Sequence, residues 1–277
     1  MRILIVGLGV VGGSYAMALK EAGYEDVYGL DTDLDTLKKA EDLRIIKKGY
    51  IDGNDIVEKC DLIILSIYPR LVKKFIQDNK NRFRKGTVIT DATGIKEMFI
   101  NDILEILPSN VDFIFGHPMA GREKKGIDYA SSKVFKGANY LITTIDRNKE
   151  ENIKLIEKLA YNIGFKKVRR ITPKYHDEMI SFTSQLPHAI AVALINSDEE
   201  GRDTGSFIGD SYRDLTRIAN INEDLWSELF LGNKSNLIKV IDEFEVELKK
   251  IKIALENNDN KCLKELFVKS TKRREKL

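Results

Sequence analysis

The chain has 277 residues, of which 43% are hydrophobic and 32% are charged, enough apolar material for a globular protein of about two domains. Its 45 basic and 43 acidic residues leave a net charge of +2, which gives no reason to expect nucleic acid or an acidic membrane as a partner. The two cysteines, Cys60 and Cys262, lie too far apart in sequence to suggest a disulfide framework or a zinc motif. No apolar run is as long as a membrane span and no signal peptide is evident, so we expect a cytoplasmic protein.

The amino-terminal segment has the pattern of a strand, a glycine turn and a helix. The aliphatic residues 3–6 are followed by the loop Gly7, Leu8, Gly9, Val10, Val11 and Gly12, and then by helical spacing. In dinucleotide-binding folds, glycines at these positions allow a tight turn, close approach of a pyrophosphate and close packing of the helix. The helix N-terminus then presents unpaired N–H groups to the anion.

Asp31 ends a second short strand at residues 27–30. Such an acid accepts both hydroxyls of an adenosine ribose and repels a 2′-phosphate, so the sequence favours NAD over NADP. The alternative is a glycine turn in an unrelated α/β protein, which would not require strand, helix and acid together.

Four further apolar runs predict buried parallel strands at residues 62–67, 88–90, 113–115 and 140–143, with helical patterns between them and an edge strand at 167–171. Ligands of such sheets bind beyond the carboxyl ends of the strands. Ser66, Tyr68, Thr93 and His117 should therefore lie on one rim beside the glycine loop. The pattern predicts an α/β fold with an N-terminal, doubly wound Rossmann sheet.

The character of the chain changes at Thr172, which is expected to cap a helix that begins at Pro173. We place the domain boundary there, with a nucleotide-binding domain at 1–172 and a helical domain at 173–277. The first long helix should be kinked by Pro187. Heptad spacing predicts a seam that either packs within its own domain or forms a dimer interface, at Leu237, Ile241, Phe244, Leu248, Ile251 and Leu255.

The chain contains three histidines. Oxidation of an alcohol by hydride transfer requires an acceptor for the hydroxyl proton, and His117 on the predicted rim is our candidate base. Its alternative role is to cap the strand end. The pattern alone favours a core position for His188 and a structural role for His176, with a charge state affected by Asp177. Arg217 stands among apolar residues and needs an anionic partner, either an internal acid or a substrate carboxylate.

Five motifs occur in order along the chain: 7–14 (GLGVVGGS), Asp31, 116–126 (GHPMAGREKKG), 172–191 (TPKYHDEMISFTSQLPHAIA) and 211–219 (SYRDLTRIA). With these motifs the chain resembles the prephenate dehydrogenase family, the dehydrogenases of tyrosine biosynthesis that include arogenate and cyclohexadienyl relatives. The resemblance implies a Rossmann domain followed by an all-helical dimerisation domain, and a homodimer with each site near the subunit interface.

The resemblance also implies a reaction, the NAD-dependent oxidative decarboxylation of prephenate to 4-hydroxyphenylpyruvate, with arogenate as the alternative substrate. In this scheme His117 accepts the proton of the C4 hydroxyl, Arg217 binds the ring carboxylate, and His188 helps to place the substrate between the domains. Further substrate-binding residues are expected to be Ser184, Arg122 and Arg213. The cofactor-binding residues are expected to be the glycine loop with Asp31, Ser66, Tyr68 and Thr93.

Several positions depart from the family pattern, among them the glycine triplet before the arginine motif, which reads Gly209, Asp210 and Ser211 here. The serine that orients the catalytic histidine is replaced by Gly94, and we expect Thr93 to substitute for it. Gln185 stands where a histidine is usual, and Arg122 stands where a small hydroxyl residue is common. An arginine near an anionic pyruvyl group favours prephenate over arogenate. Two other functions stay open, a β-hydroxyacid dehydrogenase and a non-catalytic nucleotide-binding module.

Overall fold

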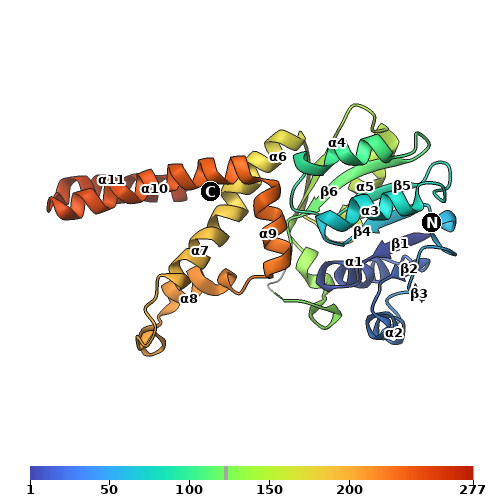
Figure 1. Cartoon of the computed structure of the whole chain (residues 1–277), viewed down its shortest axis with the longest axis horizontal. Helices are drawn as coiled ribbons and strands as arrows, with labels where there is room; N and C mark the ends of the chain where they lie inside the picture. The colour runs from blue at the N-terminus through green and yellow to red at the C-terminus, as the bar shows by residue number, and fades with distance from the viewer. Residues whose placement is uncertain (122–123, 277) are drawn as a thin grey trace.

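The computed structural model describes residues 1–121 and 124–276, and Figure 1 shows a sheet unit joined to an elongated helical unit. Within the described residues, eight strands form one sheet in the order β3-β2-β1-β4-β5-β6-β7-β8. Their bounds are β1 (Ile3–Val6), β2 (Val27–Leu30), β3 (Lys48–Tyr50), β4 (Leu62–Leu65), β5 (Val88–Asp91), β6 (Asp112–Pro118), β7 (Asn139–Thr143) and β8 (Lys167–Ile171). The predicted α/β class is confirmed.

Strands β1 to β6 are parallel, and β1 lies between β2 and β4, so the strand order reverses beside the glycine loop. This reversal is the switch point where open α/β sheets bind ligands. The prediction that residues 140–143 form another parallel strand is wrong, because β7 runs antiparallel to β6 and parallel to β8.

Strand β6 is longer than predicted and carries the candidate base within it. Its pairing with β5 ends at Ile114, but the strand continues to Pro118 by pairing with β7, where His117 lies opposite Leu141. The expected end at Phe115 is therefore corrected. A strand holds a side chain more firmly than a loop does, so His117 projects from a rigid part of the sheet.

Helices cover both faces of the sheet, and each face has its own apolar core. One core includes residues of α1 (Val10–Glu21), α2 (Leu34–Asp42) and α5 (Glu150–Asn162). The other includes residues of α3 (Pro69–Asn79) and α4 (Glu97–Ile106), together with Leu229 from the helical unit. The sheet is thus doubly wound, as predicted.

The helical unit begins at α6 (Pro173–Ile180), where the hydroxyl of Thr172 accepts a hydrogen bond from the backbone N–H of Tyr175 as expected of an N-cap. The long helix is interrupted by a π-helical turn at Ser181–Gln185, and Pro187 follows near the start of α7 (Leu186–Asn196). The remaining helices are α8 (Asp210–Thr216), α9 (Glu223–Gly232), α10 (Lys234–Glu256) and α11 (Asn260–Arg274). These bounds support the boundary that we propose at Thr172.

Helices α10 and α11 form a hairpin that extends away from the sheet unit (Figure 1). Leu237, near the start of α10, is buried against α7, whereas Leu248 and Leu255 are 54% and 61% exposed. The predicted seam therefore divides into an inner half that packs within the unit and an outer half on the surface. Among the described helices, none is both long and apolar enough to cross a membrane.

Candidate active site

The glycine loop has the geometry that a bound dinucleotide requires. A Cβ on Gly12 would lie 1.8 Å from the carbonyl oxygen of Gly7, so only glycine permits this packing of α1. Gly7 has a φ of +84°, which also favours glycine. A Cβ on Gly9 would meet no atom within 4 Å, so the backbone there is open to an incoming group. No side chain caps the start of α1, whose N–H groups can bind an anion.

Asp31 and Ser66 flank this loop. The carboxylate of Asp31 accepts hydrogen bonds from the backbone N–H groups of Leu8 at 2.7 Å and Asp33 at 3.0 Å, which fix it beside the glycine turn. The hydroxyl of Ser66 is buried and has no hydrogen-bond partner among the described residues, as expected of a group that awaits a ligand. Tyr68 lies nearby and accepts a hydrogen bond from Asn222 at 3.1 Å. These residues fit a dinucleotide.

A buried ion pair lies at the end of β5. The side chains of Asp91 and Lys96 are both fully buried, and the Lys96 Nζ lies 2.8 Å from Asp91 Oδ2. Asp91 also accepts hydrogen bonds from Thr93 and from the backbone N–H of Gly116, which tie the turn after β5 to β6. Burial lowers the pKa of Lys96, while the carboxylate of Asp91 opposes that shift.

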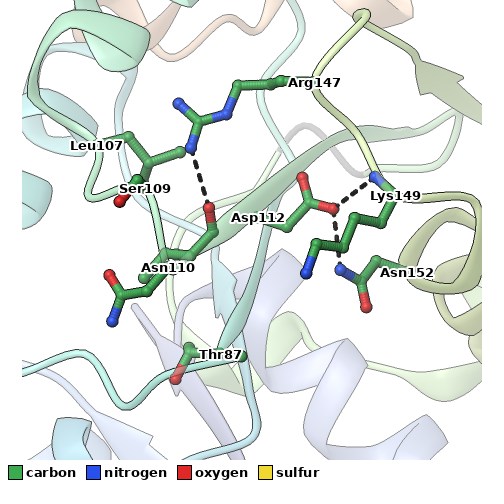
Figure 2. A pocket seen from close by; sticks show the side chains of 10 residues that line it. Thr87, Leu107, Ser109, Asn110, Asp112, Arg147, Lys149 and Asn152 are labelled. Carbon is green, nitrogen blue, oxygen red and sulfur yellow. Dashed lines mark hydrogen bonds between the residues drawn. The ribbon is translucent and has the colours of Figure 1, made fainter.

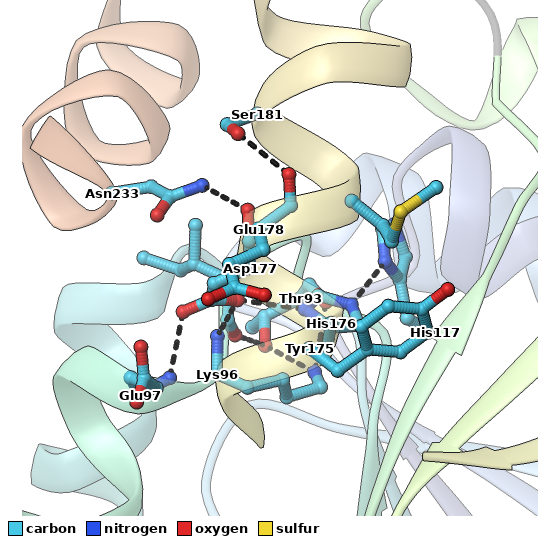
Figure 3. Close-up of polar contacts among 12 residues, drawn as sticks. Thr93, Lys96, Glu97, His117, Tyr175, His176, Asp177, Glu178, Ser181 and Asn233 are labelled. Atoms are coloured by element: carbon cyan, nitrogen blue, oxygen red, sulfur yellow. Dashed lines mark hydrogen bonds and ion pairs between the residues drawn. The ribbon is translucent and has the colours of Figure 1, made fainter. Parts of the chain in front are cut away.

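His117 is held by a histidine from the other unit (Figure 3). Its Nδ1 lies 2.8 Å from Nε2 of His176, and Nδ1 of His176 lies 2.7 Å from Oδ1 of Asp177. The carboxylate of Asp177 in turn accepts the backbone N–H groups of Lys96 and Glu97 at the start of α4. His176, which the sequence pattern indicated as structural, is thus the direct neighbour of the candidate base.

The prediction that Thr93 replaces the missing serine and orients His117 is corrected by this geometry. The Thr93 hydroxyl donates to Asp91 and accepts a hydrogen bond from Lys96 Nζ at 3.0 Å. The hydroxyl of Thr93 therefore forms its hydrogen bonds with the two residues of the buried ion pair and not with the imidazole of His117. The role of Thr93 is to hold the turn below the base.

The surroundings of both imidazoles favour their neutral forms. Burial lowers the pKa of His117 well below its usual value, and the nearby His176 and Lys96 lower it further. Burial and the Lys96 cation lower the pKa of His176 to about 2. A neutral imidazole has one nitrogen with a free lone pair, so His117 can accept a hydrogen bond or a proton.

The second ring nitrogen of His117 faces a small residue. A Cβ added to Gly94 would lie 3.7 Å from His117 Nε2 and 3.4 Å from Leu229 of α9, both ordinary contacts. The glycine therefore leaves room beside Nε2 at the junction of the sheet unit and α9. A reacting hydroxyl at this position would meet the imidazole directly.

Some of the substrate-binding candidates of the helical unit lie close to one another, and others do not. The ring of His188 stacks on Trp226 with centroids 3.7 Å apart, and its Nδ1 lies 2.8 Å from the carbonyl oxygen of Ser184. The exposed Arg217 begins a short turn that packs against α7, the helix that carries His188. Arg213 is exposed and bonds Asp210 on its own helix. Arg122 lies outside the described residues.

Gln185 occupies a structural position. Its Nε2 donates to the carbonyl of Leu229 at 2.8 Å, and its Oε1 accepts from Asn233 at 2.9 Å. Asn233 also donates to the carbonyl of Asp177. This departure from the family pattern therefore lies in a buried network between α6, α9 and α10, and it supports the segment that carries His176.

A cavity of about 330 Å³ lies at the opposite end of the sheet (Figure 2). Asp112 begins β6 there, five positions before the rim residue His117 of the same strand. The Asp112 carboxylate accepts hydrogen bonds from the side chains of Asn148 and Asn152, and Arg147 donates to two backbone carbonyls. These polar groups are satisfied within the fold, and the predicted site residues do not line the cavity.

Comparisons with known proteins agree with this geometry. Two family models match, "Prephenate dehydrogenase, nucleotide-binding domain" over residues 15–168 and "Prephenate dehydrogenase, dimerization domain" over residues 172–269. The prephenate dehydrogenase of Bacillus subtilis (strain 168) is 26% identical, with 96% of this chain and 73% of the relative covered. The cyclohexadienyl dehydrogenase of Zymomonas mobilis is 28% identical, with coverages of 99% and 94%. The prephenate dehydrogenase of A. aeolicus, in complex with hydroxyphenyl propionate and NAD+, superposes with a TM-score of 0.89 at 29% identity, covering 99% of this chain and 98% of that one.

Proposed function

The chain belongs to the prephenate dehydrogenase family, and we propose that it catalyses the NAD-dependent oxidative decarboxylation of prephenate to 4-hydroxyphenylpyruvate. The observation that carries this proposal is the position of the half-buried His117 on β6, at the same edge of the parallel sheet as the glycine loop that follows β1. In the reaction the C4–H bond gives up a hydride to the cofactor, the C4 hydroxyl gives its proton to the base, and the ring carboxylate departs as CO₂. The electron pair of the broken carbon–carboxylate bond completes the aromatic ring, and the proton returns to the phenolate oxygen of the product.

NAD is the cofactor that the residues fit. The glycine loop and the N-terminus of α1 would bind the pyrophosphate, Asp31 would accept the ribose hydroxyls, and the unpaired Ser66 hydroxyl lies on the same rim. Bound there, NAD supplies the acceptor for the hydride. The A. aeolicus relative, whose complex contains NAD+, supports this choice.

In this proposal His117 accepts the hydroxyl proton through Nε2, which lies beside Gly94, where a Cβ would be 3.7 Å from that nitrogen. An imidazole that is neutral when the substrate binds is ready to act as the base. Arg217 binds the ring carboxylate, and His188, held by Trp226 and Ser184, fixes the position of the ring. Thr93 acts indirectly, through the turn that it stabilises.

Arogenate is the alternative substrate, because the family includes enzymes for both compounds. Arg122 favours prephenate, since a guanidinium beside the pyruvyl carboxylate adds a charge-assisted hydrogen bond. The Zymomonas mobilis relative is a cyclohexadienyl dehydrogenase, and its similarity to this chain is the reason to test arogenate as well as prephenate. Measuring turnover on each substrate distinguishes the two.

We also propose that the protein is a homodimer that assembles through the helical unit. The family model that covers this unit is a dimerization domain. The outer half of α10 exposes Leu248, Ile251 and Leu255 on a hairpin that leaves the body of the molecule. Exposed apolar residues at heptad spacing are suited to packing against a second copy.

The variant His117→Asn tests the role of the base. The Asn side chain retains a donor near the position of Nδ1, so contact with His176 can persist, but the acceptor at Nε2 is lost. We expect turnover to fall by about 10² to 10⁴, the usual contribution of a general base, with NAD affinity and thermal unfolding close to wild type. Steady-state assays of NADH formation measure the turnover, NAD titrations measure the affinity, and thermal denaturation measures the stability of the variant. Near-normal turnover in a folded variant would refute the assignment of His117.

A further inference from the structure

We propose that His176 and Asp177 are positioning residues that set the tautomer of His117, so that the helical unit prepares the base carried by the sheet unit. The inference rests on the proposed function, in which His117 must present a lone pair to the substrate hydroxyl. It is carried by the chain of contacts in Figure 3, from the start of α4 through Asp177 and His176 to His117.

The first step is the state of Asp177. Its two carboxylate oxygens receive the backbone N–H groups of Lys96 at 2.9 Å and Glu97 at 2.8 Å, which are unpaired donors at the N-terminus of α4. A helix N-terminus favours a negative charge. Burial raises the pKa of this carboxyl group, whereas the two backbone N–H groups and the Lys96 cation act in the opposite direction. Because both oxygens accept N–H groups, these contacts favour the ionised form, in which Asp177 acts as an acceptor only.

The second step assigns the proton of His176. Because Oδ1 of Asp177 accepts and lies 2.7 Å from Nδ1 of His176, that nitrogen carries the hydrogen. The neutral imidazole then has its lone pair on Nε2. His176 is fully buried and extends from α6 toward the rim of the sheet, so its ring has little freedom to turn.

The third step passes this choice to His117. Nε2 of His176 lies 2.8 Å from Nδ1 of His117 and can only accept, so Nδ1 of His117 donates. The lone pair of His117 is therefore on Nε2, the nitrogen that faces Gly94. With the other tautomer, Nε2 would carry a hydrogen and could not take the proton of a substrate hydroxyl.

The neighbouring charges leave this chain of contacts intact. Nζ of Lys96 donates to Asp91 and Thr93 on the side of β5, and only its backbone N–H contacts Asp177. The cation therefore acts on the two imidazoles as a nearby charge and not as a hydrogen-bond partner. It disfavours their protonated forms, which keeps His176 a neutral acceptor.

A matched pair of variants separates positioning from simple packing. His176→Gln places an amide oxygen near the position of Nε2 and can still accept from His117, while His176→Asn keeps a donor toward Asp177 and loses the acceptor for His117. We expect the Gln variant to keep turnover within about tenfold of wild type and the Asn variant to lose about 10²-fold or more, with KM for NAD unchanged in both. A purely structural role for His176 predicts the reverse order or equal effects.

Glu178→Gln serves as the control, because it removes a carboxylate from the exposed face of the same helix. Its turnover and thermal unfolding should match wild type. If His176→Gln and His176→Asn both retain wild-type turnover, the positioning role is refuted.

Nitrogen-15 NMR of the imidazole rings reads the tautomers without substrate, and the chain has only three histidines to assign. We expect His117 and His176 of the wild-type protein each to carry a hydrogen on Nδ1, and the Asn variant to lose this single state at His117. A hydrogen on Nε2 of His117 in the wild type would overturn the inference even if the variants failed to fold. The spectrum is independent of substrate identity, so it separates failure of this inference from failure of the proposed function.

Discussion

His117 owes its chemistry to residues that sequence spacing does not place beside it. The motif around His117 indicated a base on the rim of the sheet, and the structure places His117 on β6, at the same edge of the sheet as the glycine loop after β1. Its partner His176 is 59 positions away on another unit, and no local pattern joins the two. The neighbouring Asp177 was the one available signal, because an acid beside a histidine often fixes its tautomer.

Other site residues show the same limit. Thr93 was expected to orient His117 because it adjoins Gly94, yet its hydroxyl is directed toward Asp91 and Lys96. Gln185 stands where a histidine is usual in the family, yet it is buried between helices. Sequence order shows which loop a side chain belongs to, but the direction of the side chain is decided by charged and polar neighbours from distant segments.

The imidazoles of the buried His176 and the half-buried His117 predict a pH dependence of stability. His176 and His117 have depressed pKa values in the folded protein, while in the unfolded chain a histidine takes up a proton near its ordinary value of 6.5. Their contribution to stability is therefore complete above pH 6.5 and declines as the pH falls toward the folded values. The slope is roughly 1 kcal/mol per pH unit for each imidazole.

Urea unfolding of the wild type and of His176→Gln between about pH 4 and pH 6.5 measures this effect. Asp177, Lys96 and His117 remain in the variant, and His176 lowers the pKa of His117, so the difference in slope reports His176 together with its effect on His117. We expect the wild type to lose stability more steeply with acid. Equal slopes would show that His176 is already protonated in the folded protein.

At the level of elements, the periodicity of apolar residues located most strands and helices, but it did not give the direction in which neighbouring strands pair. The aliphatic runs of β1 and β4 are fully buried, which is why they are recognisable in the sequence. The short strand β3, at Lys48–Tyr50, lacks that signal because its first residue is exposed and glycine follows. The antiparallel direction of β7 depends on the path of the connection that precedes it, and the residues of the strand itself, 139–143, carry no signal of that direction.

The starts of two helices illustrate what only the folded chain reveals. The N-terminus of α4 is capped by Asp177, and the backbone N–H of Arg70 in the first turn of α3 donates to Glu228 of α9 at 3.0 Å. Both acids come from the helical unit. The two units are therefore joined by carboxylates that satisfy the exposed N–H groups of the sheet unit's own helices.

At the level of the whole molecule, the contact between His117 and His176 joins the two units. In the site that we propose, the sheet unit supplies the glycine loop, Asp31 and His117, while the helical unit supplies His176, His188 and Arg217. The domain boundary that we propose at Thr172 was predicted from a cap residue followed by proline, a signal that is local in the sequence. The exposed outer half of α10 is the other feature that concerns the whole molecule, because it is the surface through which we propose that two copies assemble.

We predict that Leu248→Glu combined with Leu255→Glu converts the protein from a dimer to a monomer. Both leucines are exposed on α10, so the change leaves the folded chain intact while burying charge in any interface there. Light scattering after size-exclusion chromatography gives the mass, and Leu43→Glu, at an exposed leucine of the sheet unit, is the control. A double variant that stays dimeric would remove the outer half of α10 from the interface.

The most direct test of the proposed reaction is the rate of NADH formation by the wild-type protein with NAD+ and either prephenate, arogenate or a 3-hydroxy acid. We predict rapid formation with prephenate, with 4-hydroxyphenylpyruvate produced in equal amount, and much slower formation with arogenate. The 3-hydroxy acid should give no turnover above background. Two results would contradict the account. One is NADH formation with the 3-hydroxy acid but not with prephenate, and the other is the absence of NADH formation with all three compounds.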